Sequence, residues 1–210
     1  EDPQHWPQAG LWDVKHDGDD PSARILHRSY AQTLLQCQRP LQRFHSFLLR
    51  GEQPKESAMH NQTLIVFSHL RWEFVYQRPQ HLMSRLAQHY QVIFIEEPVW
   101  HSGEPYLKCD EVAANLTVVV PHSNVDAAGF HDSQIAILQP LLAELMAQNT
   151  CPLVWFYTPM ALPLLAGFKP AAIIYDCMDE LSAFDKAPLQ LRQRESALLS
   201  RADLVFTGGS

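Results

Sequence analysis

From residue 63 onward, short apolar runs alternate with longer segments that carry apolar residues at helical spacing. The runs are short and apolar throughout, as strands buried on both faces are. They cover residues 63–68, 91–99, 116–121, 152–159, 171–180 and 203–209. Helical periodicity covers residues 78–90, 132–148 and 187–202. This alternation predicts an α/β fold with a doubly wound, Rossmann-like parallel sheet.

Residues 1–62 lack this alternation and are predicted to form a separate N-terminal segment. A helix is expected over residues 23–37 and a shorter one over 41–50, followed by a linker. Residues 63–210 then form the α/β domain. Because the sequence stops at "DLVFTGGS", just after an expected strand, we expect this domain to be truncated before a further domain.

Composition restricts the class of protein. A net charge of −7 argues against a nucleic-acid partner, which would need a basic face. The 4 cysteines are far apart and form no CxxC pair, so neither a metal site nor a disulfide framework is expected. No run approaches the roughly 20 apolar residues of a membrane span, and the start lacks signal-peptide features. A cytoplasmic location is therefore expected.

Polar residues follow the predicted strands at their carboxyl ends, where ligands bind in open α/β sheets. The stretch "SHLRWEFVYQRPQHL" follows the first strand and contains no glycine, so a GxGxxG dinucleotide site is disfavoured and no cofactor is expected. Arg71 and Arg78 could bind a phosphate or carboxylate beside a helix N-terminus. His81 would share a helix face with Arg78, and Trp72 could stack on a sugar or base.

Each of these residues also has a structural alternative. The arginines could pair with Glu96 or Glu97 at the end of the second strand, and the aromatic residues could pack on the core. Later in the chain, "YDCMDE" places Asp176 and Asp179 at another strand end. Closely spaced carboxylates could hold sugar hydroxyls, ligate a metal or act as a base, whereas the alternative is a helix cap.

Five segments resemble a known family: "HLRWEFVYQRPQHLMSRLA", "VIFIEEPV", "PLVWFYTPMALPL", "IIYDCMDELSAF" and "RESALLSRADLVFTGGS". They are similar to the N-terminal half of bacterial GT-B glycosyltransferases. The nearest group is a branch of the retaining family four associated with cell-surface polysaccharide and teichuronic-acid-like synthesis. The resemblance covers about residues 63–210, and "RWxFVxQRPQHL" and "YDCMDE" are its most specific parts.

The resemblance implies an acceptor-side domain in a retaining, metal-independent glycosyltransferase. A nucleotide-sugar donor would be held mainly by a C-terminal domain, so this chain alone would be inactive. The acceptor would be a glycan or a lipid-linked glycan, which is compatible with peripheral association at the inner membrane face. Two departures from the family are the missing glycine-rich first loop and "DCMD" in place of a histidine. The alternative is a noncatalytic Rossmann-like binding or regulatory module.

The resemblance also implies roles for particular residues. Arg71 and Arg78 would lie near the donor phosphates or an anionic acceptor. Asp176 and Asp179 would lie near the reacting sugar as catalytic residues. The expected substrate-binding residues are Arg71, Trp72, Arg78, His81, Glu97 and Thr158.

Overall fold

The computed structural model describes residues 62–149, 152–179, 181 and 189–208. The helices expected in residues 1–62 lie outside these ranges. The described part forms one sheet with the strand order β3-β5-β2-β1-β6-β7-β8, and β4 also pairs with β5. The strands are β1 (Thr63–Ser68), β2 (Gln91–Glu96), β3 (Val99–Trp100), β4 (Tyr106–Ala113), β5 (Leu116–Ser123), β6 (Leu153–Phe156), β7 (Ala172–Cys177) and β8 (Leu204–Thr207).

The sheet is parallel except at β4, which runs antiparallel to β5. The strands β1 and β2 are buried almost throughout, as their apolar sequences predict. β4 has almost every residue exposed, so it shows no apolar run, and the sequence did not predict it. The prediction of an α/β fold with a doubly wound, mainly parallel sheet is confirmed.

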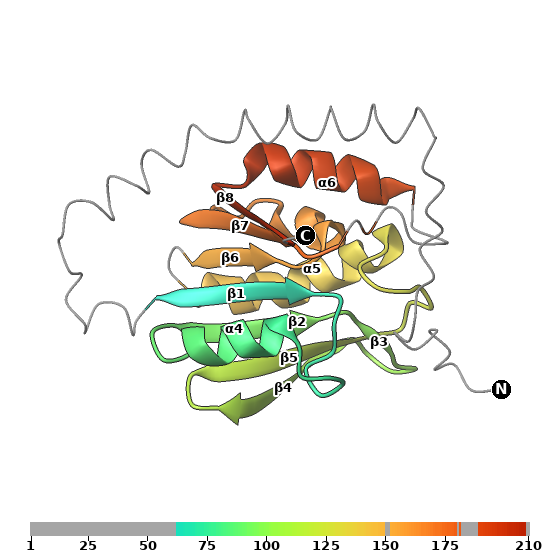
Figure 1. Cartoon of the computed structure of the whole chain (residues 1–210). Coiled ribbons are helices and arrows are strands. Elements are labelled where there is room, and N and C mark those ends of the chain that lie inside the picture. The colour runs from blue at the N-terminus through green and yellow to red at the C-terminus, as the bar shows by residue number, and fades with distance from the viewer. Residues whose placement is uncertain (1–61, 150–151, 180, 182–188, 209–210) are drawn as a thin grey trace, which may run out of the picture.

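Helices cover both faces of the sheet. They are α4 (Arg78–Leu86), α5 (Asp132–Ala147), the 3-10 helix η1 (Pro159–Leu165) and α6 (Gln190–Arg201). α4 lies on one face, where Met83 joins Val66 and Phe94 in a buried cluster. α5, η1 and α6 contribute instead to a second buried cluster on the opposite face. Figure 1 shows α4 in front of the sheet and α5 behind it.

The path of the chain reverses beside β1. After β1 the chain passes through α4 to β2 and on to β5, all on one side of β1. It then returns through α5 to β6, which pairs with the other side of β1. The carboxyl ends of β1 and β6 therefore form the topological switch point, where open α/β sheets bind their ligands.

One predicted strand is shorter than expected because a helix begins early. The strand predicted over residues 152–159 ends at Phe156, and η1 begins at Pro159. Proline is favoured in the first helical turn because that position needs no backbone N–H donor. The Thr158 side chain caps η1 by accepting a hydrogen bond from the Met160 N–H at 3.3 Å. Thr158 thus lies at the sheet edge, but it is buried.

Candidate functional site

Arg78 and Asp176 meet at the carboxyl edge of the sheet. Arg78 is the first residue of α4, and Asp176 lies in β7. The Arg78 Nε donates to Asp176 Oδ2 at 3.1 Å, and Nη2 lies 2.8 Å from Oδ1. The Asp176 side chain is 0% exposed, whereas the Arg78 side chain remains 39% exposed. The pair therefore presents a fixed guanidinium group to solvent and keeps its carboxylate inside.

The burial of Asp176 has an electrostatic consequence. Removal from water raises the pKa of the Asp176 carboxyl, and the charge and hydrogen bond of Arg78 oppose that shift. Burial thus disfavours the ionised form of Asp176, and Arg78 favours it. Because the buried carboxylate makes two contacts with the Arg78 guanidinium, it can orient that group.

Three buried polar atoms in this part of the sheet lack hydrogen-bond partners. Among the described residues, the Tyr157 hydroxyl, the Trp155 indole nitrogen and the His69 Nδ1 have none, although all three atoms are buried. Tyr157 is only 1% exposed, and burial followed by the charge of Asp176 raises the pKa of Tyr157 above its usual range. Buried polar atoms normally have partners. Of these three residues, His69 and Tyr157 directly follow β1 and β6 at the switch point, whereas Trp155 lies within β6.

His69 connects this group to Asp179. Burial lowers the pKa of His69, so the imidazole is neutral near pH 7, while the Tyr157 backbone carbonyl and the Asp179 charge oppose the shift. Asp179 is exposed in the turn after β7, whereas Asp176 is buried within the strand. The two predicted catalytic carboxylates therefore lie in different environments, and Asp179 is the one open to solvent.

A second cluster lies at the ends of β1 and β2. The Arg71 Nη1 donates to Glu96 Oε2 at 2.9 Å and to the Glu97 carbonyl at 2.6 Å. The Trp72 backbone N–H donates to Glu96 Oε1 at 2.6 Å. The Trp72 ring meets Phe94 edge-on, with ring centroids 5.1 Å apart. The Arg71–Glu96 ion pair that the sequence offered as an alternative is thus present, and Trp72 packs on the core.

Glu97 differs from its neighbours. Its carboxylate makes no hydrogen bond or ion pair with the described residues. Burial raises the pKa of Glu97 to about 7, against the opposing charge of Arg71. Glu97 is therefore a predicted site residue whose side chain the fold leaves available.

Gln80 explains how the loop between β1 and α4 forms without glycine. Its Nε2 donates to the carbonyls of Arg71 at 3.3 Å and Trp72 at 2.9 Å, and its Oε1 accepts from the Gln77 N–H at 3.0 Å. Gln80 is 1% exposed. One buried amide thus satisfies three backbone groups of the loop. The loop tip remains open, and Phe74 is one of its exposed residues.

His81 and Thr158 are not brought to the Arg78–Asp176 pair by any contact in the described residues. His81 is exposed on α4, where its ring packs edge-on against Tyr76 at a centroid distance of 4.4 Å. Thr158 caps η1. Sequence reasoning did not assign roles to Tyr157 or His69. The only feature of the sequence that could have indicated a role for them is their position, because each directly follows a strand at the switch point.

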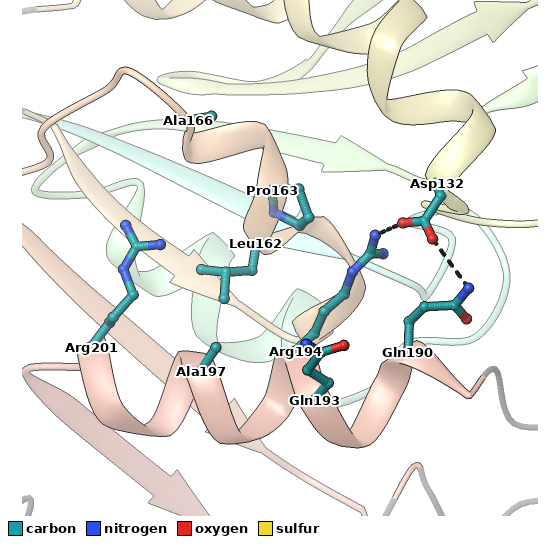
Figure 2. Close-up of a pocket in the computed structure, with 9 residues that line it drawn as sticks. All are labelled: Asp132, Leu162, Pro163, Ala166, Gln190, Gln193, Arg194, Ala197 and Arg201. Carbon is teal, nitrogen blue, oxygen red and sulfur yellow. Dashed lines mark hydrogen bonds and ion pairs between the residues drawn. The ribbon is translucent and has the colours of Figure 1, made fainter.

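A groove of about 410 Å³ lies on the other face, between η1 and α6 (Figure 2). Leu162 and Ala197 are among its apolar lining residues. Arg194 forms an ion pair with Asp132 at one end and donates to the backbone carbonyl of Met160 at 2.9 Å. Arg194 thereby ties α6 to the start of α5 and to η1.

The described residues include neither a membrane-spanning helix nor a cluster of metal ligands. No helix in these ranges is both long enough and apolar enough to cross a bilayer. Within the same ranges, no three histidine, cysteine, aspartate or glutamate side chains gather in a way that could hold a metal ion.

Comparison with known proteins gives no family assignment. No protein-family model matches the sequence, and no curated protein matches it. Among solved structures, one from E. coli, described as trehalose-6-phosphate bound with UDP-2-fluoro glucose, is 13% identical. That match covers 69% of this chain and 39% of that chain, with a TM-score of 0.45. Alpha,alpha-trehalose 6-phosphate synthase from Burkholderia multivorans is 12% identical over 70% of this chain and 40% of its own, with a TM-score of 0.42. The chain thus spans about two fifths of each structure.

Proposed function

We propose that this chain is the acceptor-side half of a glycosyltransferase. The enzyme would transfer a sugar from a nucleotide-sugar donor to a cell-surface polysaccharide or a lipid-linked acceptor. The observation that carries the proposal is the Arg78–Asp176 pair, which offers a fixed guanidinium group beside the switch point. The sequence resemblance supplies the reaction class, the retaining outcome and the expectation of a separate donor-binding domain.

Arg78 would bind an anionic group, either the donor diphosphate or an acidic acceptor. Its Nε and Nη2 face Asp176, so Nη1 and the solvent side of the guanidinium are directed away from that carboxylate. Asp176 would be a positioning residue, because it orders the arginine before a ligand arrives and so lowers the entropic cost of binding. A positioned cation stabilises the charge that develops on a leaving diphosphate.

The sugar would contact the polar atoms around this pair. Asp179 is exposed and can accept hydrogen bonds from sugar hydroxyls. The neutral Tyr157 hydroxyl and the neutral His69 imidazole can each act as a donor or an acceptor. This set of neutral and acidic polar groups fits recognition of a polyhydroxylated ligand.

The test compares this chain with the complete gene product that contains it. Calorimetry and turnover would be measured with a panel of nucleotide-sugars. The expected result is that the complete protein binds donor and transfers sugar, whereas the 210-residue chain shows no turnover. Tight nucleotide binding by the short chain alone, or no transfer by the complete protein with any donor, would contradict the proposal.

Two arginines of the same helix provide a matched comparison. Arg78→Ala is expected to lower kcat/KM about 10- to 100-fold, because one charge-assisted contact to the ligand is lost. Arg85→Ala should leave it unchanged, since Arg85 is exposed and donates only to the His81 carbonyl among the described residues. Asp176→Asn should raise the donor KM more than it lowers kcat, because Asp176 acts through Arg78.

A noncatalytic binding module is the second candidate. It is favoured by the finding that Arg71 and Arg78 are both partnered by carboxylates, which reduces the positive field at the edge. This candidate predicts saturable binding of a glycan or nucleotide without turnover by the complete protein.

A further inference from the structure

Three aromatic rings pack together at the carboxyl end of β5. The Tyr106 ring, at the start of β4, stacks on the His122 ring of β5 with centroids 4.4 Å apart and planes 8° from parallel. The His101 ring lies edge-on to both, with its centroid 5.2 Å from Tyr106 and 5.9 Å from His122. Tyr106 pairs directly with His122 across the two strands, so the register of the sheet fixes the stack. We call these three residues the ring cluster.

The backbone holds the ring cluster in one arrangement and leaves one ring face open. The His101 N–H donates to the Ser123 carbonyl at 2.8 Å. A Cβ atom at Gly103 would lie 2.7 Å from His101 Nε2, so a residue without a side chain stands where the imidazole comes close. His122 covers one face of the Tyr106 ring, and the other face is directed toward the outer side of β4. Among the described strands β4 pairs only with β5, and Tyr106 is 42% exposed, so a ligand can reach this second face.

The ring cluster lies on the same side of the sheet as the Arg78–Asp176 pair. Successive side chains of a strand point to opposite faces. Val120 packs against the buried cluster beneath α4, so His122, two positions further along β5, points to that face. Ile174 packs against the same cluster and places Asp176, two positions further along β7, on that face as well. The end of β5 lies two strands from the end of β1, which is roughly 10 Å.

Exposed apolar side chains gather at this edge of the sheet. The exposed large apolar residues of the described chain are Phe74, Val75, Tyr76, Trp100, Tyr106, Val112, Leu189 and Phe206. All except Val112 and Leu189 belong to the loop after β1, the end of β3, the start of β4 or the end of β8. Figure 1 shows β3 at the edge toward which β1 points. Such a concentration is typical of a binding surface, whereas singly scattered apolar residues are ordinary.

The His122 ring carries no charge at neutral pH. Burial lowers its pKa below the usual 6.5, and the charges of His101, Lys108 and Arg71 lower it further. The effect of Arg71 shows that the loop between β1 and α4 comes near the ring cluster. A neutral imidazole offers no cation to a phosphate or carboxylate, so the stack is not suited to an anionic ligand.

Two exposed carboxylates lie beside the ring cluster. Glu104 is in the turn between β3 and β4. The hydrogen bond and charge of Asp110 raise the pKa of Lys108, and the charge of Glu73 adds to this, so Glu73 lies near β4. Carboxylates repel the anionic headgroups of a membrane surface, whereas they accept hydrogen bonds from hydroxyl groups. The charges therefore favour an uncharged sugar over an anionic lipid surface.

We propose that the ring cluster binds an uncharged sugar unit of the acceptor glycan, stacked on the open face of Tyr106; this role rests on the proposed function. The C–H groups on one face of a pyranose ring carry small positive charges and pack on the electron-rich face of an aromatic ring. The Glu73 carboxylate can accept hydrogen bonds from hydroxyls at the rim of that sugar. Because the stack already fixes the Tyr106 ring, little conformational entropy is lost when the sugar binds.

The sugar unit at the ring cluster is not the unit that reacts. The proposed function places the donor diphosphate at Arg78 and the reacting sugar near Asp179, which follows β7. The ring cluster lies on the other side of β1, beyond β2. A long acceptor therefore gains a contact that a single sugar does not make, and the stereochemical outcome of transfer does not depend on this contact.

The binding test uses the complete gene product and calorimetry with short oligosaccharides, either uncharged or containing uronic acids. Tyr106→Leu keeps an apolar side chain but removes the ring, and it should weaken binding of the best uncharged oligosaccharide about 10-fold. Tyr106→Phe keeps the ring and should retain the affinity. Val112→Ala, at an exposed position near the other end of β4, is the control and should bind like the wild type. Tyr106→Thr is a second ring-free variant that also favours a strand, in case the leucine variant folds poorly.

Several results would overturn the proposal. They are equal affinity of the wild type and the ring-free variants, tighter binding of uronic-acid oligosaccharides than of uncharged ones, and no binding of any uncharged oligosaccharide. Flotation with vesicles of phosphatidylglycerol and phosphatidylethanolamine tests a membrane surface as the partner. If Tyr106→Leu loses vesicle binding but keeps oligosaccharide binding, the ring cluster contacts the membrane and not a sugar.

Transfer is measured separately, with the best donor and with acceptors of increasing length. Long acceptors should have a lower KM than a single sugar, and Tyr106→Leu should reduce this advantage without changing the donor KM. An undiminished advantage in Tyr106→Leu overturns the role in acceptor binding. If the complete protein binds uncharged oligosaccharides through Tyr106 but transfers no sugar from any donor, the proposed function fails while sugar binding by the ring cluster stands.

Discussion

The Arg78 guanidinium, at the start of α4, reaches the Asp176 carboxylate in β7 across the strand β6 that separates β1 from β7. The two residues are 98 positions apart in the chain. This contact joins the half of the sheet that precedes the switch point to the half that follows it. The same contact therefore contributes to the stability of the fold and fixes the position of Arg78 in the candidate site.

Removing the arginine should destabilise the protein. In Arg78→Ala the Asp176 carboxylate remains buried without its cation, so the free energy of unfolding should fall by about 2 to 3 kcal/mol, moderated because Arg78 is partly exposed. The pKa of Asp176 should also rise further, since the opposing charge is gone. Urea denaturation and carbon-detected NMR titration measure these two effects.

The exposed ion pair between Lys108 and Asp110 on β4 provides the comparison. Lys108→Ala should leave stability unchanged within error, because solvent screens such a pair. If Arg78→Ala and Lys108→Ala lower the free energy of unfolding equally, the burial of Asp176 does not add to the cost of losing its partner. A double-mutant cycle with Asp176→Asn then separates the pairing from the cost of an uncompensated carboxylate.

Glu97 should make stability depend on pH. Because its folded pKa of about 7 lies above the usual 4.5, the folded state holds a proton that the unfolded chain has already lost. Stability therefore falls as the pH rises from about 4.5 to about 7, by roughly 3 kcal/mol at most. Glu97→Gln cannot ionise, so this part of the decrease should disappear. Chemical denaturation of the wild type and of Glu97→Gln near pH 5 and near pH 8 measures this difference. If the free energy of unfolding decreases equally in both proteins, the raised pKa of Glu97 is contradicted.

The sequence predicted the fold because the information lies in local patterns. Buried strands such as β1 and β2 are apolar runs, and α4 shows its buried face at Met83 by spacing alone. The antiparallel strand β4 was missed because it is exposed on both sides and paired only to β5. The early end of β6 depended on Thr158 capping η1, a contact that no hydrophobic pattern signals.

The site was less predictable, because its contacts join distant residues. Strand ends indicated that Arg71, Glu97 and Asp176 would share one edge, but periodicity does not show which carboxylate pairs with which arginine. The Arg78–Asp176 contact crosses a strand, and it depends on strand order rather than on sequence spacing. The position of Gly129 beside Glu97 likewise depends on how β2 and the loop before α5 pack.

Gln80 should control the order of the loop between β1 and α4. Gln80→Leu keeps the volume but leaves the carbonyls of Arg71 and Trp72 and the Gln77 N–H without their partner. The free energy of unfolding should fall by about 2 kcal/mol. Hydrogen exchange should speed up at Gln77, whose N–H loses its acceptor. Unchanged exchange there would mean that the loop is held by the Arg71–Glu96 pair instead.

Gly129 provides the sharpest test of how the Glu97 carboxylate is packed. Gly129→Ala places a side chain at φ +58°, which costs about 1 to 2 kcal/mol, and its Cβ displaces the carboxylate that lies 2.6 Å away. Because a glutamate end group can move, we expect the carboxylate to shift toward water and the pKa of Glu97 to fall from about 7 toward its usual value. NMR titration of the Glu97 carboxyl carbon measures this change. The variant Gly167→Ala is the control, since Gly167 also has a positive φ but has open space at its Cβ. Gly167→Ala should lower the free energy of unfolding by a similar amount and leave the titration of Glu97 unchanged. A Glu97 pKa that stays near 7 in Gly129→Ala would mean that the glycine does not determine the packing of that carboxylate.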